Sequence, residues 1–211
     1  MIRFSLFGIP IEVQPFFWIS LVLLGGINGV DTAGGIFKIL IFVIAGFISI
    51  TVHELGHALT ARRYGASSHI VLQAFGGYAA YTGARMSRLQ SFLVTAAGPA
   101  IQIFLGIIFL IIWRLLPNLN ETGEHFLKVL IGISFAWAII NLLPVMPLDG
   151  GQMMNAALGP KRIKITLWVS IVVAVVVGVS LFIATGQFLF PIFLGFFAWQ
   201  AFQALQENRP R

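Results

Sequence analysis

Long apolar segments alternate along this chain with short stretches that hold most of its charged residues. Six such segments run over about residues 16–30, 35–62, 89–116, 126–143, 163–184 and 188–205. An α-helix of about 20 apolar residues crosses a bilayer, and the first segment lies at the short edge of the usual range. The pattern therefore predicts an all-α polytopic membrane protein, with about six transmembrane helices in one domain that covers residues 1–211.

Two stretches outside these segments alternate as β-strands do. Residues 70–81 predict two strands around Gly76 and Gly77, and thus a short β-hairpin. Residues 3–15 could form a short strand or lie at the membrane interface. Within the third apolar segment, the small residues at 95–99 would let another backbone approach closely.

Composition supports the membrane assignment and narrows the chemistry. Hydrophobic residues make up 58% of the chain and charged residues 9%, whereas soluble domains are about one quarter charged. The absence of cysteine means that a bound metal would have nitrogen and oxygen ligands. The net charge of +6 indicates basic residues at the cytoplasmic face of a membrane rather than nucleic-acid binding.

The distribution of Lys and Arg predicts the orientation, because short cytoplasmic loops are enriched in both. Six spans place both termini on one side, and that side then carries ten of the thirteen basic residues: Arg3, Arg62, Arg63, Arg85, Arg88, Lys161, Arg162, Lys164, Arg209 and Arg211. The other side carries Lys38, Arg114 and Lys128. The count therefore predicts cytoplasmic termini in a cell-membrane protein, provided that the number of crossings is even.

The second apolar segment contains the sequence His53-Glu54-Leu55-Gly56-His57. On an α-helix the two histidines lie one turn apart on the same face, so that both imidazoles can bind one cation. Glu54 lies beside that face and could accept a proton from a water activated by the metal, as in H-E-x-x-H metallopeptidases. Such residues are costly to bury in a bilayer and indicate a functional site.

Asp149 is the candidate for a third ligand. His57 lies five residues, or about 8 Å, before Arg62, so the histidine pair is expected near the cytoplasmic face. The fourth apolar segment runs toward the same face, and Asp149 follows it. Asp149 could instead be the N-cap of a short helix over residues 150–158. Its expected depth favours a ligand, with water in the fourth position of a catalytic zinc site.

Two motifs together make the chain resemble the site-2 proteases, a family of intramembrane zinc metalloproteases. Residues 53–57 match the family's H-E-x-x-H motif, and residues 141–151 match its N-x-x-P-x-x-P-L-D-G-G motif. The resemblance implies that His53, His57 and Asp149 bind Zn²⁺ and that Glu54 is the general base. It also implies that Asn141 helps to hold the substrate or the oxyanion, and that the substrate is a transmembrane segment of another protein.

Other features follow from the same resemblance. The family has a membrane-associated hairpin where Gly76 and Gly77 lie, which could bind substrate or serve only in packing. Where the family often has A-G-P-x-x-N, this chain has Gln102 in place of the Asn, which keeps an amide at that position. His69 could contact the metal or lie at the membrane interface. Without a PDZ-like insertion or a C-terminal regulatory domain, the chain would be a minimal member.

The function that these observations favour is hydrolysis of a peptide bond in or near the transmembrane segment of a membrane-protein substrate. The partners would be that substrate and the lipid bilayer, and the cofactor Zn²⁺. A metal transporter would instead distribute polar residues along a path through the bilayer, whereas here they gather near one face. A catalytically inactive scaffold that binds membrane helices would have lost Glu54 or a ligand, and all four positions are present.

Overall fold

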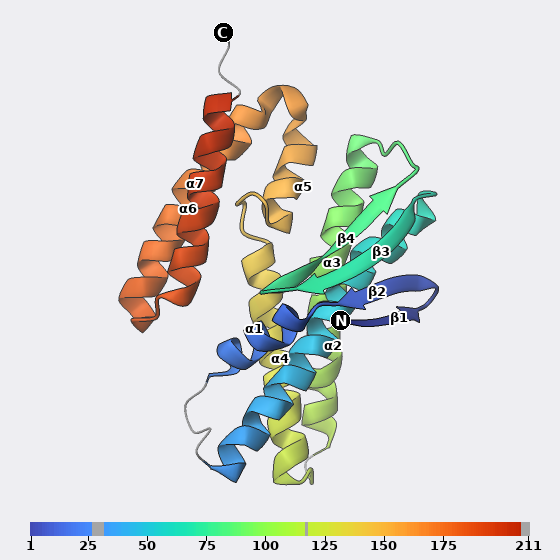
Figure 1. Cartoon of the computed structure of the whole chain (residues 1–211), viewed down its shortest axis with the longest axis vertical. Coiled ribbons are helices and arrows are strands. Elements are labelled where there is room, and N and C mark those ends of the chain that lie inside the picture. The colour runs from blue at the N-terminus through green and yellow to red at the C-terminus, as the bar shows by residue number, and fades with distance from the viewer. Residues whose placement is uncertain (27–31, 117, 208–211) are drawn as a thin grey trace. The chain divides into compact units, whose positions relative to one another are not determined.

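The computed structural model describes residues 1–26, 32–116 and 118–207, which form seven α-helices and four strands (Figure 1). The helices are α1 (Pro15–Gly25), α2 (Ala33–Arg63), α3 (Arg88–Leu115), α4 (Glu121–Asn141), α5 (Asp149–Leu158), α6 (Ile163–Thr185) and α7 (Leu189–Glu207). The chain divides into two compact units, one of residues 1–85 and 97–138 and the other of residues 86–96 and 139–211.

Five helices of the described chain are long and apolar enough to cross a membrane, namely α2, α3, α4, α6 and α7, the α6 span beginning at Pro160. They coincide with five of the apolar segments, which confirms the prediction of an all-α polytopic fold. The first segment differs, because α1 has 11 residues and is about 16 Å long. It ends where Gly26 takes a φ of +83° and its N–H bonds to the carbonyl of Leu23. The rest of the predicted first span, residues 27–30, lies outside the described residues.

The strands form one sheet in the first unit, with the order β1 (Ile2–Leu6), β2 (Ile9–Val13), β3 (Ser67–Gln73) and β4 (Gly76–Thr82). β1 and β2 are antiparallel, β2 and β3 are parallel, and β3 and β4 are antiparallel. The prediction of a strand within residues 3–15 is therefore confirmed, and this stretch forms a hairpin of two strands rather than one.

The turn of the second hairpin lies at Ala74 and Phe75, since Gln73 pairs with Gly76. The prediction that the strands meet around Gly76 and Gly77 was wrong by two residues, because both glycines begin β4. Phe75 takes the left-handed φ of +60°, although it is not glycine. Its N–H is held by the hydroxyl of Ser20 at 3.0 Å, a contact that the local sequence does not reveal.

A hydrophobic core joins the sheet and α1 to α2. Its buried side chains come from all these elements, as Ile11 of β2, Phe17 of α1, Ile50 of α2 and Leu72 of β3 illustrate. Arg62, near the end of α2, donates a hydrogen bond to the carbonyl of Phe7 in the β1–β2 turn. The N-terminal hairpin is thereby fixed to the end of α2 that carries Arg62.

α1 runs antiparallel to α2. A Cβ atom at Gly46 of α2 would lie 2.8 Å from a methyl carbon of Leu21, and one at Gly25 would lie 2.9 Å from the ring of Phe42. The chain therefore leads from the Arg62 end of α2, through β2 and α1, toward the end at which α2 begins.

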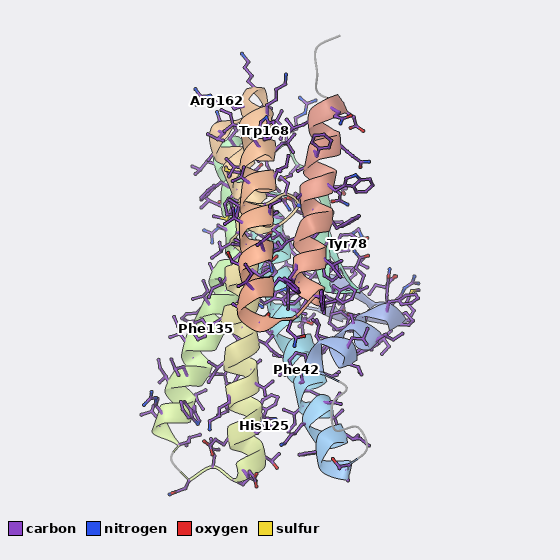
Figure 2. The ribbon with its side chains drawn as sticks, turned by 90° about the vertical axis from the view of Figure 1, so that its left-hand side faces the viewer. Phe42, Tyr78, His125, Phe135, Arg162 and Trp168 are labelled. Carbon is purple, nitrogen blue, oxygen red and sulfur yellow. The ribbon has the colours of Figure 1, made fainter. Side chains whose placement is uncertain are left out.

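In the second unit, α6 and α7 form an antiparallel pair that is joined through Gly186, which has a φ of +65°. Small residues such as Ala174 and Ala198 are buried where the two helices meet. Large apolar side chains project outward from the pair, among them Trp168, which is 58% exposed (Figure 2). An apolar outer surface of this kind is suited to lipid.

Candidate functional site

His53 and His57 form a buried pair on α2, and their rings point at one another. Their Nε2 atoms are 3.1 Å apart, and the two side chains are 3% and 8% exposed. Two nitrogens that bind a tetrahedral zinc at about 2.0–2.1 Å lie about 3.4 Å from one another. The pair thus presents two ring nitrogens to one point at a separation close to that of zinc ligands.

α3 lies close to this pair because its side chains are small where the helices meet. A Cβ atom at Gly98 would come within 3.0 Å of three ring atoms of His57. A Cβ atom at Gly56 of α2 would come equally close to the carbonyl of Ala97. The small-residue run therefore brings the α3 backbone against the imidazole of His57.

Glu54 is buried on α2, with 5% of its surface exposed, and β4 runs past it. A Cβ atom at Gly77 would lie 3.0 Å from Cγ and 3.2 Å from Oε1 of Glu54. The absence of a side chain at Gly77 leaves the space that this carboxylate fills. Gly76 precedes it, and a Cβ atom there would lie 3.5 Å from the indole of Trp137.

Gln102 of α3 contacts His53 directly, a role that the sequence left open. Its Oε1 lies 2.9 Å from His53 Nδ1, and its Nε2 donates to the hydroxyl of Ser49 at 2.8 Å. All three side chains are buried. One signal in the sequence pointed to this contact, since Gln102 lies four residues after Gly98 and so shares the face of α3 that meets α2.

Asp149 belongs to the second unit and is the first residue of α5, with 8% of its surface exposed. The N-cap position is taken by Leu148, so Asp149 does not have the capping position considered above. Gly150 and Gly151 press the first turn of α5 against the backbone of residues 142–146, where a Cβ atom on either glycine would come within 3.0 Å. These close contacts fix the position of Asp149 within its unit.

The remaining candidates differ in their surroundings. Asn141 is the last residue of α4 and is half-buried. His69 lies in β3 opposite Ala80 and is exposed. Among the described residues, the group that could hold a metal ion consists of His53, His57 and Asp149, all of them buried, and His69 is not part of it.

Comparison with known proteins places this chain in a family. The model of peptidase family M50 matches residues 41–123 and 116–184. A protein named zinc metalloprotease from Methanocaldococcus jannaschii is 31% identical over 159 residues, which are 75% of this chain and 45% of the relative. The stage IV sporulation protein FB of Bacillus subtilis is 28% identical over 149 residues, 69% of this chain and 46% of the relative. The chain thus spans less than half the length of these relatives.

The fold is also that of a solved structure. The site-2 protease from Methanocaldococcus jannaschii matches all of this chain and 97% of its own, with a TM-score of 0.69 and 26% sequence identity. The family model covers the histidine pair, Glu54, Gln102 and Asp149 alike. From its sequence and from its fold, the chain belongs to peptidase family M50, the family of the site-2 proteases.

Proposed function

We propose that this protein is an intramembrane zinc metalloprotease, which hydrolyses a peptide bond in or near the transmembrane segment of membrane-protein substrates. The buried histidine pair carries the proposal, with its Nε2 atoms 3.1 Å apart beside the carboxylate-bearing Glu54. The name of the Methanocaldococcus jannaschii relative supports it.

The ligands in this proposal are Nε2 of His53, Nε2 of His57 and the carboxylate of Asp149. The donor atoms suit Zn²⁺, which binds imidazole nitrogen and carboxylate oxygen, and a catalytic site uses three protein ligands and leaves one position open. When bound, Zn²⁺ lowers the pKa of a water molecule toward neutrality and polarises a carbonyl group.

Glu54 is the general base in this mechanism. It follows His53 directly on α2, so its carboxylate flanks the ligand face without belonging to it. The carboxylate accepts the proton of the attacking water and then delivers it to the leaving nitrogen of the peptide bond. Burial excludes bulk water that would compete for this proton.

The outer edge of β4 is the proposed substrate-binding element. Within the described sheet, β4 pairs with β3 and lies at the end of the strand order. An extended peptide could add to this edge through backbone hydrogen bonds, which give affinity with little sequence preference. Gly76 and Gly77 lie in β4, and Gly77 contacts Glu54, so a peptide on this edge would run past the base. Asn141 is proposed to help hold the substrate or its oxyanion.

The membrane orientation in this proposal has both termini in the cytoplasm. α1 is too short to cross the bilayer alone, yet the N-terminal hairpin is fixed to the Arg62 end of α2. The path through β2 and α1 therefore serves as the missing crossing, and the number of crossings stays even. The base then lies near the cytoplasmic side, where Arg62 and Arg63 end α2.

The test combines zinc analysis of the detergent-purified protein with cleavage of a panel of single-span substrates. Glu54→Gln is expected to retain zinc and to lose cleavage, because an amide keeps the shape but cannot accept the proton. Asp149→Ala is expected to weaken zinc binding. His125→Gln is the control, because His125 lies near the start of α4 and outside the candidate ligand group (Figure 2). Wild-type turnover by Glu54→Gln would refute the mechanism.

A further inference from the structure

A series of buried polar side chains connects α4 to His53. The hydroxyl groups of Ser134 on α4 and Ser49 on α2 are 3.0 Å apart. Ser49 accepts from Gln102 Nε2 at 2.8 Å, and Gln102 Oε1 lies 2.9 Å from His53 Nδ1. Ser134, Ser49 and Gln102 have no exposed surface, and His53 is 3% exposed.

The orientation of the Gln102 amide is set by Ser49. Nε2 of Gln102 faces both the hydroxyl of Ser49, at 2.8 Å, and its backbone carbonyl, at 3.5 Å. A backbone carbonyl can only accept, so turning the amide over would place two acceptor oxygens against one another. The amide nitrogen therefore stays on the Ser49 side, and Oε1 faces His53.

This orientation determines the tautomer of His53. Oε1 is an acceptor, so the hydrogen bond at 2.9 Å requires a proton on His53 Nδ1. In the neutral ring the lone pair then lies on Nε2, which is the atom that faces His57 Nε2. A ring held in the other tautomer would present an N–H group to the metal position.

We infer that Gln102 is a positioning residue, which holds His53 in the Nδ1–H tautomer so that Nε2 can bind the metal, with Ser49 and Ser134 fixing Gln102 in turn. The inference rests on the proposed metal site. Partners of this kind, bonded to the far nitrogen of a ligating histidine, are worth about 10- to 100-fold in metal affinity. Gln102 is thus expected to matter for zinc binding although it does not touch the metal.

The inference is tested first in the metal-free protein. The chain has four histidines, so long-range proton–nitrogen correlation spectra of ¹⁵N-histidine-labelled protein resolve the ring nitrogens, and His53→Ala identifies the signals of His53. The wild type is expected to show His53 protonated at Nδ1. Gln102→Met keeps the length of the side chain and removes the acceptor, and should shift His53 toward the Nε2–H tautomer.

Zinc affinity, measured by competition with a chelator, is the second measurement. Gln102→Met is expected to bind zinc about 10- to 100-fold more weakly than the wild type. Gln102→Glu keeps an acceptor for Nδ1–H, so it should retain the wild-type tautomer and bind zinc about tenfold more tightly than Gln102→Met. Gln203→Met is the control, because it removes an exposed amide on α7.

The outcomes separate this inference from the proposed function. An unchanged His53 tautomer together with unchanged zinc affinity in Gln102→Met would overturn the inference and leave the proposed function standing. A wild-type protein that binds no zinc would instead refute the proposed function. If Met at position 102 prevents folding, Gln102→Asn is measured in the same way. Asn is one carbon shorter and cannot reach both His53 and Ser49, so wild-type values for it would also overturn the inference.

Discussion

Replacing Gly98 by alanine tests whether the close approach of α3 positions His57, one of the proposed metal ligands. The added Cβ would come within 3.0 Å of three ring atoms of His57, whereas ordinary contacts begin at 3.4 Å. The ring or the α3 backbone must therefore move by roughly 1 Å. Overpacking of this size costs about 1–3 kcal/mol.

A shift of that size is larger than a functional site tolerates, since ligands must stay within about 0.5 Å of their productive positions. Gly98→Ala is therefore expected to weaken zinc binding by at least about tenfold, or about 1.4 kcal/mol. The assay is chelator competition on detergent-purified protein, accompanied by thermal unfolding with and without zinc. The midpoint difference between the two unfolding curves should shrink in the variant, because a weaker ligand stabilises the folded state less.

Gly132→Ala is the matched control. Gly132 also lies within a helix, but a Cβ atom there would have no neighbour within 4 Å. Alanine in a helix interior is favoured over glycine by about 0.5–1 kcal/mol, so this variant should be at least as stable as the wild type and bind zinc normally. Wild-type zinc affinity in Gly98→Ala would refute the argument that the α3 backbone positions His57.

The remaining predictions concern Asp149, the substrate edge and the site of cleavage. Gly150→Ala should lower zinc content, because its Cβ would meet the backbone carbonyls of residues 142 and 143 and displace Asp149, whereas Gly195→Ala, with no neighbour within 4 Å, should not. Alternate residues of an antiparallel strand turn their N–H groups away from the partner strand, so the N–H group of Ala79 lies on the open edge of β4. Ala79→Pro should therefore keep its zinc content and lose cleavage, when both are measured on the same preparation. Helix-weakening Gly or Asn near the cytoplasmic end of a substrate span should speed cleavage, and mass spectrometry should find the cuts near that end. Cuts near the opposite face would contradict the proposed membrane orientation.

The features that the sequence predicted are those that local patterns determine. Apolar length located five helices to within a few residues, and the match to known proteins confirmed the family that the two motifs indicated. The helical spacing of His53 and His57 needs only the geometry of one turn, and both rings lie on α2 as that spacing requires.

The features that escaped prediction depend on partners far away in the chain. Residues 11–13 pair in parallel with residues 70–72, and no local signal states that pairing. Phe75 takes a turn position that its own preferences disfavour, and its N–H is bonded to Ser20, 55 residues earlier. Gln102 could be placed on the right face of α3, but its bond to His53 depends on how α3 and α2 meet.

The parallel pairing of β2 with β3 has a consequence for the order of assembly. The two strands are separated in the chain by α1 and by the 31 residues of α2, so their pairing closes a long crossover connection. Contacts over such distances along the chain form slowly compared with helices. β4, which lies beyond β3, meets Glu54 through the same sheet. Glu54, the proposed general base, is therefore expected to acquire its surroundings late in biogenesis, once α2 is already in place.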